Sequence, residues 1–328
     1  MMVEPMYSPW GTVDHCKMLC YGAFEVQTAR HGGVMILREL ADEYLSKEAQ
    51  AVGFVEGCYL CFEEDCDAPV VIRELLDKNL MKAPVNEYYK EGEYTELPDA
   101  YKSINESFIH AGAMNDSKVK VRYVKAEKVN DQSAAELFEG VSGIFVAPGS
   151  GSRGVDGKIA AVKYARENNI PFFGINLGMH CAVVEFARNV LGLEDAASAE
   201  LDATTKHPVV SLMEENKIEK GSVRRIGGYV CTLTPESKSA AAYGITSVME
   251  RHSNSYEFNS DYREQFEAAG MKCVGINPET QLVEVLELEN HPWFIATQYH
   301  PEYKSTVEHP APLFVDFVAA ALKYSENK

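Results

Sequence analysis

The segment at residues 171–180 is the feature that most restricts how this chain folds. Its apolar start predicts a buried strand, and the residues after Asn176 predict a helix. Gly174 and Gly178 allow a sharp turn that pushes the central side chain out at the carboxyl edge of a sheet. Such a nucleophile elbow carries Ser or Cys in enzymes, where a nearby His activates it. Here the centre is Asn176, whose carboxamide is neither a useful nucleophile nor a base near neutral pH.

From about residue 95 onward, helical and strand patterns alternate. The pattern predicts helices at 99–111, 156–168 and 312–324, and strands at 119–124, 143–147 and 171–175. This alternation indicates βαβ units, and hence an α/β fold with a mainly parallel sheet that has helices on both faces. Later segments are shorter and richer in β-branched residues, which predicts hairpins at one sheet edge, at 223–234, 271–276, 282–287 and 293–299.

The first 85 residues differ from the rest and predict a small α+β domain. They contain five of the eight cysteines, at positions 16, 20, 58, 61 and 66. Helical spacing predicts a helix at 34–47, a strand follows at 55–62, and Pro69 marks the start of a second helix. Residues 80–95 are polar and Tyr-rich without periodicity, which is typical of a linker. We therefore predict two domains, 1–85 and 86–328, the first of unknown role.

Composition and charge favour a cytoplasmic protein that acts on a small molecule. The 328 residues carry a formal net charge of −18, which argues against nucleic acid as a partner, since phosphate backbones need a basic surface. No apolar run is long enough to span a membrane, and the first residues lack the pattern of a secretory signal. The cysteines have no regular disulfide spacing, so we expect reduced thiols.

Residues from about 93 to 323 resemble the glutaminase domain of CTP synthase, a class I glutamine amidotransferase. The resemblance rests on long stretches, including two helices at 157–168 and 185–191 and the segments His207-Pro208-Val209-Val210, Glu250-Arg251-His252 and Gln298-Tyr299-His300-Pro301-Glu302. It implies the amidotransferase-like fold. The family's synthetase domain is not matched in these residues, so we do not expect this chain alone to make CTP by the family route.

The resemblance also implies a mechanism, and several of its parts are altered here. In the family a Cys thiolate attacks the amide of glutamine, a His oriented by a Glu moves protons, and backbone N–H groups stabilise the oxyanion. The His–Glu pair corresponds to His300 and Glu302, whereas the Cys corresponds to Asn176 and a glutamine-contacting Gln to His180. The oxyanion loop at 148–154 is one residue shorter than in the family. The segment 251–257 lacks two cations that would bind a carboxylate.

These comparisons yield the candidate site residues. The catalytic candidates are His300, Glu302, Asn176 and His180, and the ligand-binding candidates are Gly149, Ser150, Gly151, Leu177, Glu200 and Ser253. Glu200 corresponds to the family's Glu that receives the substrate's amino group. For Asn176 an alternative remains open: Asn tolerates unusual backbone angles, so it would merely maintain the turn.

Metal binding is a second alternative for the same residues. His180 and His300, with Glu200 or Glu302, offer two imidazoles and a carboxylate, which suits zinc or another divalent ion. The N-terminal cysteines at 16, 20, 58, 61 and 66 offer a further candidate zinc site, although most buried cysteines are simply small apolar residues. Cys181 points about 100° around the helix from His180, so we expect it in the core.

Two functional hypotheses follow from these residues. In the first, the pocket is repurposed for a different small-molecule ligand or reaction, with a hydrolase or transferase chemistry that uses His300 and Glu302. In the second, the chain is an inactive pseudo-glutaminase that acts as a binding or regulatory subunit. Because glutaminase domains of this family work inside oligomers, the resemblance also raises a homo-oligomer as an expectation.

Overall fold

The computed structural model describes residues 4–28, 31–63, 67–81, 101–149, 151–213 and 224–327. The chain forms two compact units, Met1–Lys102 and Ser103–Lys328. The predicted boundary at residue 85 lies outside the described residues, and so do Cys66 and Ser150. The predicted linker at 80–95 also lies outside them, apart from its first two residues. Among the described residues, no helix combines the length and apolarity that crossing a membrane requires.

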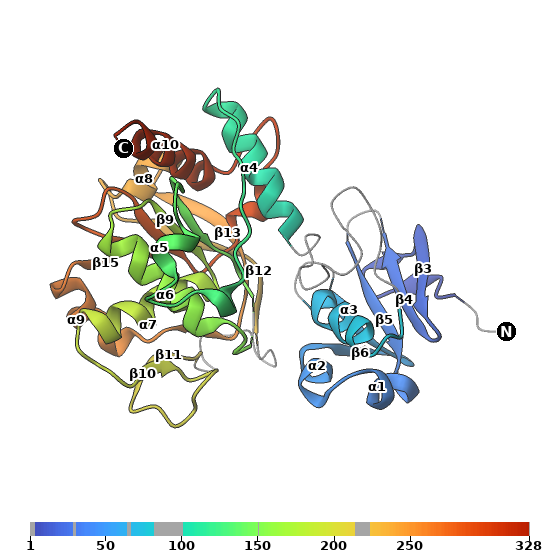
Figure 1. The fold of residues 1–328 in the computed structure, drawn as a ribbon. Coiled ribbons are helices and arrows are strands. Elements are labelled where there is room, and N and C mark those ends of the chain that lie inside the picture. Colours follow the sequence, from blue (N-terminus) through green and yellow to red (C-terminus); the bar gives the residue numbers. More distant parts are fainter. Residues whose placement is uncertain are drawn as a thin grey trace. The chain divides into compact units, whose positions relative to one another are not determined.

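The first unit is a small α+β domain built on an antiparallel sheet, as expected (Figure 1). The sheet has the order β3 (His15–Cys20), β4 (Ala23–Gln27), β5 (Gly32–Leu37), β7 (Tyr59–Glu63) and β6 (Phe54–Glu56). The short strands β1 (Tyr7–Ser8) and β2 (Gly11–Thr12) form a separate ladder. Three helices pack on the larger apolar core: α1 (Arg38–Tyr44), α2 (Lys47–Val52) and α3 (Ala68–Asp77).

Two predictions in this unit need correction. The helix predicted at 34–47 is wrong in its first part, because Val34 and Ile36 belong to the central strand β5, where β-branched side chains pack well. Helical spacing holds only from Arg38 onward. The strand predicted at 55–62 is a hairpin, β6 and β7, that turns at Gly57 with φ of 58°. The helix that starts near Pro69 is confirmed as α3.

Three neighbouring strands of the second unit are parallel and hold the elbow. Strand β9 (Phe172–Ile175) lies between β8 (Ile144–Val146) and β17 (Phe294–Thr297), and it is parallel to both. Successive side chains of a strand point to opposite faces. Phe173 packs against Phe314 of α10 (Pro312–Glu326), while Phe172 belongs to the core with α6 (Val155–Glu167) and α7 (Leu177–Asn189). The predicted helices on both faces are confirmed.

The whole sheet is mixed, so the expectation of a mainly parallel sheet is wrong for the described residues. Its order is β13 (Ser247–Asn254), β12 (Arg225–Leu233), β15 (Met271–Ile276), β16 (Val283–Leu288), β17, β9 and β8. The strands from β13 to β17 pair antiparallel. They extend the sheet rather than forming separate hairpins at its edge. The strand predicted at 119–124 is wrong. These residues are exposed or half-buried and pair with no strand among the described residues, so their alternating pattern does not produce a strand.

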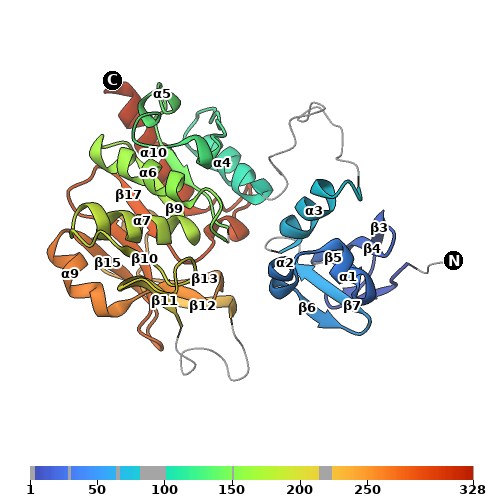
Figure 2. The same cartoon turned by 60° about the horizontal axis from the view of Figure 1, so that its bottom comes forward.

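Smaller elements complete the second unit (Figure 2). A three-stranded sheet contains β10 (Ala196–Ser198), β11 (His207–Leu212) and β14 (Tyr256–Phe258). Helix α7 contacts all three of these strands as well as β9. The remaining helices are α4 (Lys102–Met114), α5 (Ala134–Leu137), α8 (Lys238–Tyr243) and α9 (Arg263–Ala268), with 3-10 turns at Ala126–Lys128 (η2), Ser260–Tyr262 (η4) and Pro301–Lys304 (η5).

A charged cluster is buried within the antiparallel half of the large sheet. The Arg225 guanidinium donates to Glu284 Oε1 at 2.7 Å, and His252 Nε2 lies 2.6 Å from Glu284 Oε2. All three side chains are at most 1% exposed. Burial raises the pKa of Glu284, but His252 and Arg225 together outweigh it and hold the pKa below its ordinary value. The cluster therefore ties β12, β13 and β16 together through an ionised carboxylate.

We expect Glu284→Gln to lower the free energy of unfolding of the second unit by about 3 kcal/mol or more, because it leaves the buried Arg225 without a counter-charge. Asp131→Ala is the matched control, since it breaks the more exposed Lys163–Asp131 pair and should cost at most about 1 kcal/mol. Urea unfolding followed by Trp293 fluorescence, in a Trp10→Phe background, reports this unit. Equal losses in both variants would contradict the buried ion cluster.

Candidate functional site

The elbow forms as the sequence predicts, with a strained residue at its centre. Asn176 has φ of 52° and ψ of −107°, between the end of β9 and the start of α7. Two close approaches explain the flanking glycines. A Cβ atom at Gly178 would lie 2.3 Å from the carbonyl oxygen of Val146, and one at Gly174 would lie 2.8 Å from the backbone of Gly178. The glycines therefore let α7 pack directly on β8 and β9, which aims the elbow at the sheet edge.

Asn176 is buried and bonded on both its backbone and its side chain. Its backbone N–H donates to the Thr297 carbonyl at 2.7 Å, which joins the elbow to the end of β17. Its side-chain Nδ2 donates to the Ser253 carbonyl at 3.3 Å. The carboxamide therefore bridges the elbow to strand β13 and has a structural role whatever else it does.

His300 and Glu302 form the hydrogen-bonded pair that the sequence predicts. His300 Nδ1 lies 2.8 Å from Glu302 Oε1, and the imidazole stacks on the Tyr303 ring at 4.9 Å. Because the carboxylate accepts from Nδ1, a neutral imidazole presents the lone pair of Nε2. His300 Nε2 is buried and has no hydrogen-bond partner among the described residues. The pair thus has the arrangement of a base and its orienting carboxylate.

Strand β13 brings this pair and the elbow together. The backbone N–H of His300 donates to the Arg251 carbonyl at 2.8 Å, while Asn176 Nδ2 donates to the Ser253 carbonyl. The carbonyls of residues i and i+2 on one strand point the same way and are about 7 Å apart. His300 and Asn176 therefore converge at neighbouring positions along one strand.

His180 lies one turn into α7 and is a neutral imidazole. Its Nε2 lies 3.0 Å from Gln298 Oε1, so Nε2 carries the proton and donates. Burial lowers the pKa of His180 to about 4, against a smaller raising effect of the Gln298 hydrogen bond. His180 Nδ1 and Gln298 Nε2 are both buried without a hydrogen-bond partner in the described structure.

Arg224, which sequence reasoning missed, lies beside Ser253 and acts electrostatically on Glu200. The Arg224 guanidinium donates to Ser253 Oγ at 2.8 Å. The pKa of Glu200 is raised because its carboxyl is desolvated, although the residue as a whole is exposed; the Gly151 backbone hydrogen bond and the Arg224 charge lower it by less. Gly151 has φ of 78°. Of the predicted ligand-binding residues, Ser253 thus adjoins Asn176, and the Glu200 carboxylate accepts from the Gly151 backbone.

Two further ionisable residues near the site, Glu250 and Lys158, were not predicted as site residues. In the sequence they stood out only as part of segments that resemble the family. Burial raises the pKa of Glu250 to about 7; Lys304 and the Tyr243 hydrogen bond lower it, and Glu302 raises it. Lys158 Nζ and the side chain of Leu177 each lie 3.6 Å from the position that a Cβ atom at Gly149 would occupy. Gly149 and Leu177 therefore adjoin each other at the elbow as predicted, with a lysine beside them.

Cys181 is not a substitute nucleophile. It is 1% exposed within the apolar core, as expected, and burial raises the pKa of its thiol to about 12. The thiolate is therefore scarce near neutral pH.

The described residues contain no group of three or more His, Cys, Asp and Glu side chains that could hold a metal ion. The site predicted from His180, His300 and a carboxylate is thus not assembled: His180 uses a ring nitrogen for Gln298, and His300 uses one for Glu302. In the first unit Cys58 is exposed and Cys61 is buried, while Cys66 lies outside the described residues.

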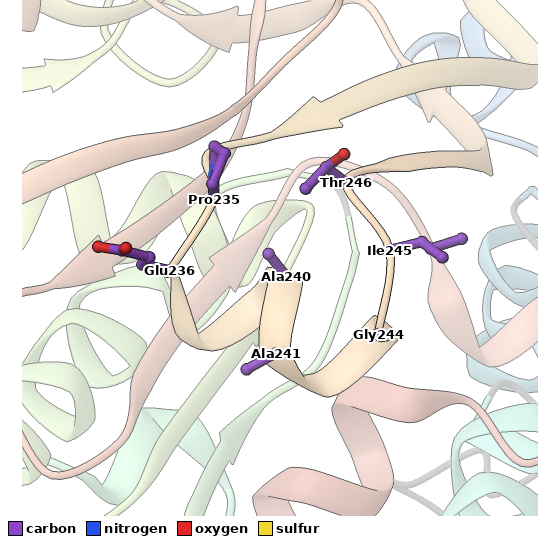
Figure 3. Close-up of a pocket in the computed structure, with 7 residues that line it drawn as sticks. All are labelled: Pro235, Glu236, Ala240, Ala241, Gly244, Ile245 and Thr246. Atoms are coloured by element: carbon purple, nitrogen blue, oxygen red, sulfur yellow. The ribbon is translucent and has the colours of Figure 1, made fainter.

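A pocket of about 280 Å³ lies elsewhere in the second unit (Figure 3). It is formed by α8 and the segments that join it to β12 and β13, and its lining is mostly small or apolar: Pro235, Glu236, Ala240, Ala241, Gly244, Ile245 and Thr246. Glu236 is its sole ionisable lining residue. None of the predicted site residues lines this pocket.

Comparisons with known proteins identify the family of the second unit. The family model of glutamine amidotransferase class-I matches residues 96–320. The chain belongs to the class-I glutamine amidotransferase family. A second model, a domain of unknown function (DUF7007), matches residues 3–129.

Individual relatives of this family member point the same way. It is 56% identical over 239 residues to a CTP synthase of Cytophaga hutchinsonii, which covers 72% of the chain and 44% of that relative. It is 55% identical over 236 residues to the CTP synthase of Christiangramia forsetii, covering 71% and 43%. The chain therefore spans less than half the length of these curated relatives.

A solved structure confirms the fold of the second unit. The Trypanosoma brucei CTPS glutaminase domain with bound acivicin is similar with a TM-score of 0.66 and 36% sequence identity. The match covers 72% of this chain and 91% of that domain. The resemblance to the CTP synthase glutaminase domain is thereby confirmed.

The buried neutral His180 predicts a pH dependence of stability. Its pKa is near 4 in the folded protein and 6.5 ordinarily, so the unfolded chain binds the proton more readily. Stability is therefore lost as the pH falls below about 6.5, by about 2 kcal/mol between pH 7.5 and pH 5. Urea unfolding of His180→Gln at both pH values should show a fall smaller by that amount. His309→Gln, at an exposed site, is the control and should leave the fall unchanged.

Proposed function

We propose that this protein is a class-I glutamine amidotransferase homologue that does not use the family's cysteine route, and that its pocket serves a different small-molecule ligand or reaction. The observation that carries the proposal is Asn176, which occupies the strained centre of the elbow where a thiol or hydroxyl would otherwise stand. A carboxamide cannot form the covalent intermediate on which that route depends.

His300 and Glu302, which correspond to the family's His–Glu pair, supply the base in the proposed reaction. His300 Nε2 is a buried lone pair oriented by Glu302, which suits a base acting on water or on a substrate hydroxyl. Gly149 and Leu177 stand where backbone N–H groups would stabilise an oxyanion, and Gly151, Glu200 and Ser253 would contact the ligand. Ser150 belongs to this proposal by its sequence position. The chemistry is hydrolytic or a group transfer without a cysteine intermediate.

The recognition groups near the elbow also differ from those expected for glutamine. His180 offers an uncharged acceptor at Nδ1, and Ser253 is a short neutral side chain on β13. A ligand with two hydrogen-bond donors would be needed to satisfy both His180 Nδ1 and His300 Nε2. These groups support a change of ligand rather than a simple loss of the nucleophile.

One observation favours the alternative, an inactive pseudo-glutaminase that acts as a binding or regulatory subunit. The Asn176 carboxamide already donates to the Ser253 carbonyl, so it holds the elbow against β13 without any ligand. In that case Asn176 only stabilises the elbow, and His300 is retained from the family without a catalytic role.

Glutamate release from glutamine separates these possibilities. We expect none above background from the wild type or from Asn176→Cys, because the altered surroundings of residue 176 remain in the variant. Release by the wild type would contradict the proposal, and Cys181→Ala would then show whether Cys181 is responsible. Release by Asn176→Cys alone would favour the pseudo-glutaminase, because the pocket would still recognise glutamine. His300→Ala in the Asn176→Cys background is the control for that activity.

A further inference from the structure

Glu250 is a buried carboxyl that the proposed chemistry does not use. It lies on β13 and is 4% exposed, and its Oε1 accepts from the Tyr243 hydroxyl of α8 at 3.0 Å. Its Oε2 is 3.8 Å from Lys304 Nζ and has no hydrogen-bond donor within the described part of the chain. One oxygen of Glu250 is therefore left without the donor that a buried carboxylate requires.

The carboxylate of the His300–Glu302 pair has the same deficiency. Glu302 is 3% exposed, and its Oε1 lies 2.8 Å from His300 Nδ1. Its Oε2 is buried and has no hydrogen-bond partner in the described structure. A buried carboxylate in this condition opposes a second negative charge nearby, because neither burial nor hydrogen bonding offsets the repulsion.

Strand β13 and the turn η5 bring the two carboxyl groups together. Lys304 Nζ donates to the carbonyl of the residue before Glu250 at 2.6 Å, and the His300 backbone N–H donates to the carbonyl of the residue after it at 2.8 Å. Glu302 lies midway in the chain between the two donating residues. The two glutamates therefore occupy the centre of one contact between β13 and η5, and the charge of Glu302 raises the pKa of Glu250.

The groups packed around Glu250 let its carboxyl change charge near neutral pH. Burial raises the pKa of Tyr243, Tyr299 and Cys231, so these groups are uncharged there. Lys304 is half exposed, so solvent weakens its charge, and burial of Glu250 raises the pKa of this carboxyl to about 7. Among the described residues, the ionisable neighbours of Glu250 are Tyr243 of α8, Tyr229 and Cys231 of β12, Tyr299 after β17, Lys304 and Glu302 of η5, and His252 on β13 itself.

We infer that Glu250 is a positioning residue that acts on His300 through Glu302: once ionised, it adds a second buried negative charge to the pair and makes His300 hold a proton more tightly. The inference rests on the proposed function, in which His300 is the base. A negative charge favours the protonated imidazole, and solvent screens a buried charge only weakly. While Glu250 is neutral, His300 gives up its proton more easily and is ready to act as the base.

Nuclear magnetic resonance titration tests this coupling without any ligand. We expect the Glu250 carboxyl carbon, assigned with Glu250→Gln, to titrate with a midpoint near pH 7. The His300 imidazole, assigned with His300→Gln, should titrate in the wild type at a pH higher by about 0.5 or more than in Glu250→Gln, because the variant is uncharged at every pH. Glu308→Gln is the matched control and should leave the His300 midpoint unchanged, because it removes an exposed charge that solvent screens.

A measurement on the wild type covers the case in which Glu250→Gln does not fold. With resonances assigned through bonds, the His300 titration curve should be broader than that of a single independent group, because its proton affinity rises as Glu250 ionises. A Glu250 midpoint below about pH 5 would overturn the inference. So would equal His300 midpoints in the wild type and a folded Glu250→Gln, a His300 curve that fits one independent proton, or an equal shift in Glu308→Gln.

These outcomes are distinct from those for the proposed function. A wild type that releases glutamate would refute the loss of the cysteine route, yet a Glu250-dependent shift at His300 would still stand. Absence of that shift would refute the role of Glu250, yet the lack of glutamate release would still support the proposed function.

Discussion

The hydrogen bond from the Asn176 N–H to the Thr297 carbonyl, at 2.7 Å, is the interaction on which the site depends. It continues the parallel pairing of β9 with β17 by one step beyond the last paired residues, Ile175 and Thr297. The chain after β9 must then turn at once into α7, and the chain after β17 leads to His300. Because parallel strands end at the same edge of a sheet, this pairing places both segments over one edge. The glycines at 174 and 178 make the turn possible, since any larger side chain would collide with the neighbouring backbone.

The other side of the site comes from the far end of the same sheet. Strand β13 is separated from β9 by four strands in the sheet order, yet its carbonyls at Arg251 and Ser253 accept from His300 and Asn176. The sheet must therefore curl back on itself, and the buried Arg225–Glu284–His252 cluster lies in the half that curls. A charge cluster of this kind is costly to bury and costly to break, so it restricts which arrangement of β12, β13 and β16 is stable. The cluster thus stabilises β13, the strand whose carbonyls accept from Asn176 and His300.

The ligand that we propose for the elbow would meet neutral imidazoles and charged groups of both signs. His180 is neutral because burial opposes its protonation, and the lone pair of His300 is held in place by Glu302. Arg224 and Lys158 place positive charge on two sides of the elbow, one beside Ser253 and the other beside Gly149. Glu200 adds a carboxyl whose pKa is raised by desolvation.

The sequence alone determined the local elements whose signal is carried by neighbouring residues. The elbow, helix α6, helix α10 and strand β15 follow directly from glycine spacing and apolar periodicity, and the resemblance identified His300 and Glu302 as a pair. Only the tertiary structure decided that β12 to β17 extend one mixed sheet, that 119–124 pairs with nothing in the described chain, and that residues 34–37 form a strand. It also brought Arg224 and Lys158 to the elbow. The physical reason is that strand pairing and the neutralisation of buried charge depend on partners far away in the chain, whereas a turn or a helix depends on residues a few positions apart.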